Sequence, residues 1–93
     1  MSVKVRELIG TMIKTRIYLE TKSDITNFVN ICENFPFDVF LEDKNGVYRV
    51  SAKSTLGVIL AKAEWAETYC VTNCTDSKWL NFLIHSLDRN KFS

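Results

Sequence analysis

Residue types that mark common functional sites are scarce in this sequence. Its 93 residues include three cysteines, three glycines and one histidine. The cysteines (Cys32, Cys70 and Cys74) are odd in number and form no C-x-x-C pair, so they predict reduced thiols rather than a disulfide framework or a zinc site. No glycine-rich phosphate loop and no acid–base pair is evident. The sequence therefore predicts a protein that is not an enzyme and has no cofactor or metal.

Long runs of one charge and long apolar runs are missing as well. Twelve Lys and Arg residues are scattered from Lys4 to Lys91 and leave a formal net charge of +1. This even distribution does not favour a nucleic-acid groove. No apolar run approaches the about 18 residues that span a bilayer, and the N-terminus lacks the apolar core of a signal peptide. We therefore expect a cytoplasmic protein with no membrane or nucleic-acid partner.

The sequence does contain ample apolar material, since 46% of its residues are hydrophobic and 12% are aromatic. This amount suits one domain with one modest core. Residues 1–12 are weakly periodic and are expected to form an N-terminal extension, followed by a domain over residues 13–93. Asn45 and Gly46 predict a hairpin turn. Alternating apolar and polar positions predict four strands, at residues 13–20, 37–42, 48–53 and 67–73.

Apolar residues at helical spacing predict three helices. The first covers about residues 24–34, with Ser23 as its N-cap and Pro36 beyond its end. The third begins at residues 75–77 and places the lone histidine, His85, on its water side, where a solvated side chain is expected. The apolar stripe of this helix is expected to be buried: Trp79, Leu80, Leu83, Ile84 and Leu87.

The second helix is short and directly follows a strand. Ser54 is its natural N-cap, because the hydroxyl can accept a hydrogen bond from an unpaired amide of the first turn. Val58 and Leu60 are expected to face the sheet, which leaves Leu56 and Ile59 at least partly outside. The full order is β-α-β-β-α-β-α, and three helices on one face of a four-stranded sheet bury every stripe. The sequence therefore predicts an α+β two-layer sandwich.

Two segments carry a resemblance to a known family. Ala52-Lys53-Ser54 followed by Leu56-Gly57-Val58, and the run Asp38-Val39-Phe40-Leu41-Glu42 before the Asn45-Gly46 turn, resemble HPr. HPr is the histidine-containing phosphocarrier protein of the bacterial sugar phosphotransferase system. The resemblance extends over about residues 13–87 and includes the order of the elements. It implies an open-faced sandwich whose four-stranded sheet is antiparallel.

The loop that matches the active site of HPr departs from the pattern of the family. In HPr a catalytic histidine precedes the first helix inside a Gly-x-His-x-Arg-Pro segment. The matching loop here contains Thr21, Lys22 and Ser23 and has no histidine, arginine or proline. A phosphorelay needs an imidazole nucleophile, and a hydroxyl cannot replace it without an activating base. We therefore interpret these three residues as a degenerate former active-site loop and do not expect phosphocarrier activity.

Ser54 matches the second feature of HPr, a regulatory serine that a dedicated kinase phosphorylates at the start of the second helix. Lys53, Leu56 and Ile59 are the candidate partner-docking residues, while the polar Thr55 replaces a third apolar docking position. The resemblance implies a regulatory or protein-interaction module, with a serine kinase or a transcriptional regulator as its partner. Two alternatives stay open: Ser54 is only an N-cap, or the protein is a scaffold that forms a homo-oligomer through its apolar helix without a phosphotransfer link.

Overall fold

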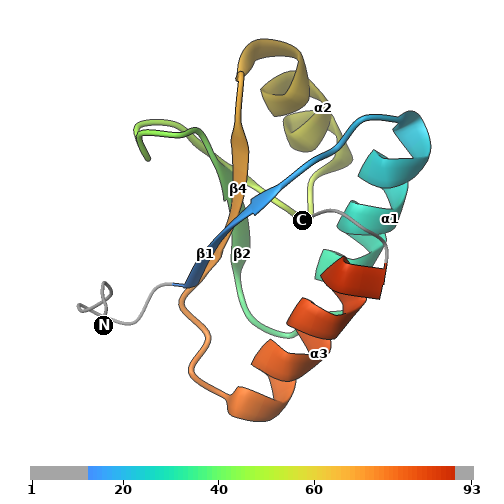
Figure 1. Ribbon diagram of the computed structural model, residues 1–93, viewed down its shortest axis with the longest axis vertical. Coiled ribbons are helices and arrows are strands. Elements are labelled where there is room, and N and C mark those ends of the chain that lie inside the picture. The colour runs from blue at the N-terminus through green and yellow to red at the C-terminus, as the bar shows by residue number, and fades with distance from the viewer. Residues whose placement is uncertain (1–12, 90–93) are drawn as a thin grey trace.

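A computed structural model describes residues 13–89, which form seven elements in the predicted order (Figure 1). The proposed extension over residues 1–12 and the last residues, 90–93, lie outside the described residues, so the domain boundary stays a prediction. The elements are β1 (Ile13–Ile17), α1 (Lys22–Glu33), β2 (Val39–Glu42), β3 (Arg49–Ser51), α2 (Thr55–Glu64), β4 (Thr68–Thr72) and α3 (Ser77–Arg89). No helix within residues 13–89 is long and apolar enough to cross a membrane.

The four strands form one sheet in the order β1-β4-β2-β3, and every neighbouring pair is antiparallel. The register places Cys70 of β4 between Thr15 of β1 and Leu41 of β2. The three helices cover one face of this sheet, so the predicted α+β two-layer sandwich is confirmed (Figure 1). Within residues 13–89, no helix lies on the other face.

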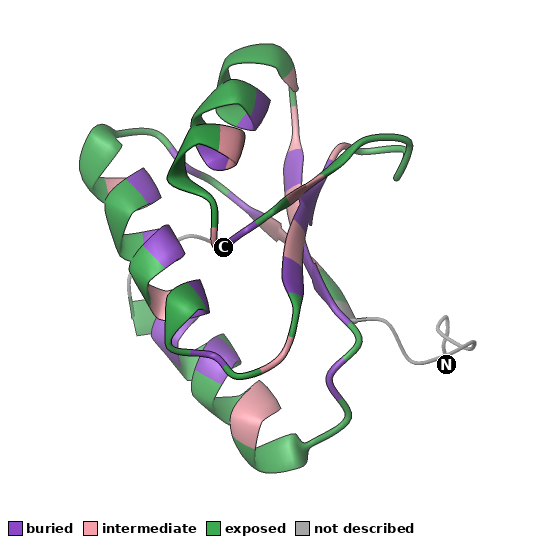
Figure 2. Cartoon of the chain, turned by 180° about the vertical axis from the view of Figure 1, so that it is seen from behind, coloured by how far each residue is buried: buried purple, intermediate pink, exposed green. Residues whose placement is uncertain are grey.

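The core lies between the sheet and the helices. Ile17, Val39 and Leu41 point from the strands toward α1 and α3, and Phe28 and Cys32 meet them from α1 with almost no exposed surface. Figure 2 shows buried segments along the strands and on the side of the helices that faces the sheet. Each large apolar side chain buried in this way stabilises the fold by roughly 1.5–3 kcal/mol. The expectation that Cys32 fills the core is confirmed.

Two predicted burial assignments are wrong. Leu60 and Ile84 were expected to face the core, but both are largely exposed. Successive residues turn by about 100° around a helix, so the side of α2 that faces the sheet holds Val58 and Ala61 and directs Leu60 outward. On α3 the inner positions at matching spacing are Leu83, Ser86 and Leu87.

The hairpin between β2 and β3 follows from two residues in its turn. Gly46 has a φ of 70°, which glycine adopts without a steric penalty. The Asp43 carboxylate accepts hydrogen bonds from the amides of Val47 (2.8 Å) and Tyr48 (3.0 Å) and so closes the loop. The predicted turn is confirmed. β3 is shorter than residues 48–53, because Tyr48 is exposed beyond its last paired position, Arg49 opposite Glu42.

Candidate functional site

The start of α2 presents Ser54 to solvent. Its backbone is extended, with φ −104° and ψ 110°, and its Oγ accepts a hydrogen bond from the Gly57 amide at 3.1 Å. Its own amide donates to the Ser51 carbonyl at 3.1 Å. The predicted capping role is therefore confirmed, and the side chain that performs it is exposed.

Gly57 allows this cap to lie against the sheet. A Cβ at this position would lie 3.3 Å from Ser54 Oγ and 3.3 Å from the Val50 Cβ of β3. Both separations are tighter than ordinary van der Waals contact, so a larger residue would push the first turn of α2 away from β3. The spacing Ser-x-x-Gly thus has a structural reason: the serine caps the helix, and the glycine lets the capped turn pack closely.

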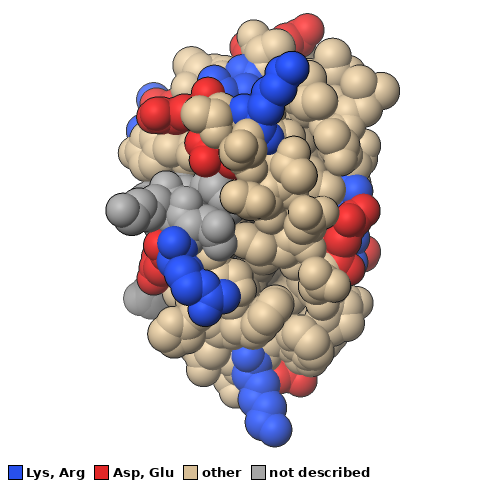
Figure 3. Space-filling model, turned by 90° about the vertical axis from the view of Figure 1, so that its right-hand side faces the viewer, with Lys and Arg blue, Asp and Glu red and all other residues tan. Residues whose placement is uncertain are grey.

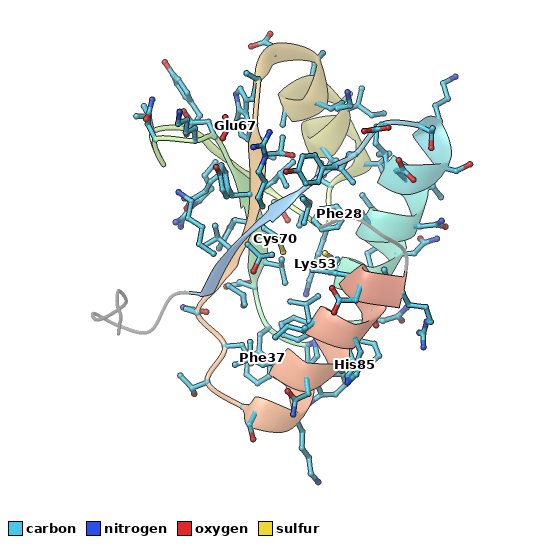
Figure 4. The ribbon with its side chains drawn as sticks, viewed as in Figure 1. Phe28, Phe37, Lys53, Glu67, Cys70 and His85 are labelled. Carbon is cyan, nitrogen blue, oxygen red and sulfur yellow. The ribbon has the colours of Figure 1, made fainter. Side chains whose placement is uncertain are left out.

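Lys53 has a structural contact that sequence reasoning did not foresee. Its Nζ donates a 2.7 Å hydrogen bond to the Phe35 carbonyl, just beyond the end of α1, and the contact is partly buried. Figure 4 shows Lys53 between the sheet and the helix layer. A cation is favourable near the carbonyl end of a helix. Lys53 therefore ties the start of α2 to the end of α1, and its role in docking stays a prediction.

The outer side of α2 is apolar. Leu56 is 67% exposed and Leu60 is 54% exposed, and Ile59 lies between them at helical spacing. We call Leu56, Ile59 and Leu60 the α2 strip. Leu60 was missing from the predicted set, although its spacing of one residue from Ile59 and four from Leu56 places it on the same face. An exposed apolar strip on a small domain is typical of a protein interface.

The surface around the α2 strip is poor in charge. On the face shown in Figure 3, which views the helix layer, uncharged side chains fill much of the middle and charged ones lie mostly toward the margins. In α1 the charges are confined to Lys22, Asp24 and Glu33, near its two ends, and in α2 to Lys62 and Glu64 in its last turn. Depletion of charge in the middle of a surface is a feature of protein interfaces.

The start of α1 is organised differently. Thr21, not the predicted Ser23, is the N-cap: Thr21 Oγ1 accepts from the Asp24 amide at 3.1 Å. The Asp24 carboxylate reaches back and accepts from the amides of Glu20 (2.8 Å) and Thr21 (3.0 Å). This is a capping box, and its acceptor stands three residues after Thr21, where Ser23 has no equivalent. Hydrogen bonds from the Glu20 and Thr21 amides lower the pKa of Asp24.

The loop of Thr21, Lys22 and Ser23, predicted to be a degenerate former active-site loop, is poorly suited to hold an anion. The amides of Glu20 and Thr21 already bind a carboxylate that belongs to the same helix. A further anion at this end would meet the negative charge of Asp24 at short range. The geometry does not favour phosphoryl chemistry at this loop.

The lone histidine and the thiols do not add a reactive group. His85 is exposed on α3, as expected from its place outside the apolar stripe (Figure 4). Cys32, Cys70 and Cys74 are free and buried. Burial raises the pKa of Cys70 to about 12 and raises that of Cys32 as well. Thiols held in the protonated form are poor nucleophiles.

Comparison with solved structures places this arrangement among known folds. The crystal structure of HPr-C-His from Thermoanaerobacter tengcongensis matches 86% of this chain and 93% of its own, with a TM-score of 0.62. The fold is HPr-like. The two sequences are 15% identical over the match, so the likeness to HPr is one of fold. No protein-family model and no curated protein sequence matches the chain.

Proposed function

We propose that the protein is an HPr-like regulatory or protein-interaction module that acts through the start of α2, and that it is neither a histidine phosphocarrier nor another kind of enzyme. The observation that carries the proposal is the exposed Ser54 cap directly beside the exposed α2 strip. A hydroxyl that a kinase can phosphorylate and an apolar contact surface therefore lie next to each other on α2. The proposal links the protein to the regulation of sugar transport in a bacterial cytoplasm.

Phosphorylation of Ser54 is compatible with the local structure. A phosphoryl group adds about two negative charges, which a helix N-terminus stabilises through its dipole and its unpaired amides. The first turn of α2 contains no acidic residue. The cap geometry of Ser54 also directs its oxygen toward the Gly57 amide, which can donate to a phosphate oxygen instead. The helix can therefore hold the modification and present it to a partner.

The α2 strip supports a protein partner. Leu56, Ile59 and Leu60 lie exposed along one side of a helix, and an exposed apolar strip of this kind is typical of a protein interface. A serine kinase is the partner that would modify Ser54, and a transcriptional regulator is the kind of partner that would read the modified helix. The start of α1 gives the negative half of the proposal, because the Asp24 carboxylate already accepts hydrogen bonds from two amides of a loop that has no histidine.

The direct test is incubation of the full chain with an HPr serine kinase and ATP, followed by intact-mass and peptide mass spectrometry. We expect one phosphate, on Ser54, and none on the Ser54→Ala variant. The neighbouring hydroxyls of Ser51 and Thr55 are internal controls for site selection. No added phosphate, or phosphate at another residue, contradicts the proposal. Transfer of phosphate from phosphoenolpyruvate through the first enzyme of the relay is expected to be absent.

A second candidate function uses the same α2 strip: the protein is a scaffold that forms a homo-oligomer through α2 and has no link to phosphotransfer. The observation that favours it is the exposure of three large apolar side chains on one helix. Light scattering with size-exclusion chromatography separates the two candidates. The scaffold predicts a dimer or larger assembly that Leu56→Asp dissociates and Ser54→Ala leaves intact. A monomer that a serine kinase modifies supports the regulatory module.

A further inference from the structure

The face of the sheet opposite the helices carries a layer of alternating charge and aromatic rings. The register forms one row across all four strands, from Arg16 through Tyr69 and Glu42 to Arg49. A second row contains Lys14, Val71, Phe40 and Ser51. Because side chains alternate between the two faces of a sheet, all of these residues point away from the helices. We call this surface the open face.

Three cations lie over three rings on the open face. Lys14 Nζ is 5.0 Å from the centroid of the Tyr69 ring. Arg16 Cζ is 4.7 Å from that of Tyr18, at the end of β1, and Arg49 Cζ is 4.6 Å from that of Phe40. Contacts of this kind contribute roughly 0.5–1 kcal/mol at exposed sites and hold the charged groups in place. The cations are therefore arranged before any partner arrives.

The carboxylates of the open face are more deeply buried than its cations. The Glu42 side chain is only 8% exposed, and it forms ion pairs with Lys14 (3.5 Å) and with Arg49, each of which is far more exposed. Glu67 is 25% exposed and accepts a 2.7 Å hydrogen bond from the Tyr69 hydroxyl. The outermost charges of this surface are thus positive, although the chain as a whole is almost neutral.

The two arginines of the open face differ in how well their guanidinium groups are paired with carboxylates. Arg49 donates from Nε at 3.0 Å and also from Nη2 to one oxygen of Glu42. Within residues 13–89 Arg16 forms one ion pair, a longer contact from Nη1 to Glu67 at 3.7 Å, and its buried Nε has no hydrogen-bond partner. A buried donor without an acceptor costs roughly 1–3 kcal/mol. Of the two guanidinium groups, that of Arg16 is therefore the less satisfied and gains more from an added carboxylate.

We propose that the open face binds an acidic, extended segment of a partner protein. Lys14 and Arg16 are two residues apart on β1, which separates them by roughly 6.6 Å, the spacing of alternate side chains on an extended peptide. Guanidinium edges match carboxylates in charge and geometry. Single-stranded nucleic acid fits less well, because binding it relies on free ring faces for base stacking and cations already cover three rings here.

This site uses other residues than the one in the proposed function. The α2 strip belongs to the helix layer, and the open face lies on the other side of the sheet. The two surfaces meet at one hollow, which both Leu60 and Arg49 line, whereas Arg16 lies on the opposite edge strand, β1. The open face can therefore be tested through Arg16 without assuming that Ser54 is modified.

The test is a fluorescence-anisotropy titration of the full chain with a labelled peptide in which glutamate alternates with threonine. The same peptide with glutamine in place of glutamate, and labelled oligothymidylate, are the comparison probes. We expect the glutamate peptide to bind most tightly, with an affinity that falls as salt is raised. Loss of one charge-assisted contact in Arg16→Gln should weaken binding roughly tenfold, and Arg16→Gln with Arg49→Gln should weaken it further.

Matched controls separate this site from general charge attraction. Lys78→Gln with Arg89→Gln removes two exposed cations from α3 and should leave peptide binding unchanged, as should Leu56→Asp in the α2 strip. If Arg49→Gln does not fold stably because Glu42 loses an ion-pair partner, the peptide affinity of the Arg16→Gln variant alone tests the proposal. The proposal is overturned if the glutamate peptide does not bind, or if oligothymidylate binds more tightly than the peptide. It is also overturned if the helix-cation control loses as much peptide affinity as Arg16→Gln.

Discussion

Helices α1 and α2 both begin at an exposed hydroxyl side chain, Thr21 and Ser54, and both hydroxyls accept a hydrogen bond from the amide three residues later. Their first turns differ in charge. α1 supplies its own anion, since Asp24 binds two amides at the start of the helix, whereas the first turn of α2 has no acidic residue. Of the two helix starts, that of α1 already holds a negative group, and that of α2 is still able to accept one.

The same pair of helix starts also differs in how closely it packs on the sheet. α2 touches β3 through Gly57, and Lys53 ties its entry to the end of α1. The position of Ser54 is therefore fixed from two sides. A hydroxyl held in one place is a better landmark for a partner than one on a loose loop, because less ordering is needed on binding.

The largest effect is expected from breaking the close approach at α2. Gly57→Val places branched carbon where a single Cβ would already lie 3.3 Å from both Ser54 Oγ and Val50 Cβ. We expect overpacking to lower the free energy of unfolding by about 2 kcal/mol. Thr55→Val is the matched control in the same turn, exposed in the native structure, and should change stability by less than about 0.5 kcal/mol. Urea denaturation measures both, and equal stability of the two variants would show that the turn can relax.

The next largest effect on stability is expected from removing the N-cap hydroxyls of α1 and α2, and the two helix starts should differ in how they respond to acid. Thr21→Ala and Ser54→Ala should each destabilise the protein by about 1 kcal/mol at neutral pH. The pKa of Asp24 is lowered in the folded protein, so its carboxylate stabilises the fold above the unfolded-chain pKa of about 3.9. That contribution is lost as the pH falls through the lower folded-state pKa.

The stability difference between the wild type and Asp24→Asn should therefore be present at neutral pH and shrink in acid. Urea denaturation at a series of pH values from neutral to acid measures this. The difference between the wild type and Ser54→Ala should not follow the same pH course, since no acidic residue lies in the first turn of α2. A pH-independent effect of Asp24→Asn would show that the carboxylate has no special role at the start of α1.

Much of the fold could be predicted because its signals are local. Two-residue and 3.6-residue periods, the Asn45-Gly46 turn and Pro36 define the seven elements within short windows of the chain. The predicted N-cap of α1 was also wrong for a local reason. Thr21-x-x-Asp24 meets the requirement of a capping box, whereas Ser23 was chosen only because it lies next to the first apolar stripe. Burial of Leu60 was wrong because α2 is mostly apolar, so its sequence does not reveal which side meets the sheet. Burial of Ile84 was wrong because the inner side of α3 follows Leu83, Ser86 and Leu87 and leaves Ile84 at its edge.

The remaining features depend on tertiary structure. Lys53 contacts the carbonyl of Phe35, 18 residues earlier in the chain, and nothing near Lys53 in sequence points to it. The open face depends on the strand order β1-β4-β2-β3, which brings Arg16 and Arg49 into one row. Three of the scattered basic residues, whose spread along the chain argued against a nucleic-acid groove, are brought together there by the fold. Local patterns therefore predicted the helices, the strands and the N-cap role of Ser54. The contacts between elements, such as that of Lys53, depend on how the elements pack.

The smallest effect tests the comparison of the two helix starts most directly. Thr55→Glu and Ser23→Glu each add one carboxylate to an exposed position in the first turn, of α2 and α1 respectively. At α2 the added charge meets an N-terminus without an acid, so we expect about 0.5 kcal/mol of added stability at low salt. At α1 it lies next to Asp24, whose repulsion offsets the gain. Urea denaturation at low and high salt measures both variants, and the benefit at α2 should fade as salt screens it. Equal stabilisation by the two substitutions would mean that Asp24 leaves the start of α1 as receptive to an anion as that of α2, and the electrostatic case for Ser54 over the loop of Thr21, Lys22 and Ser23 would fail.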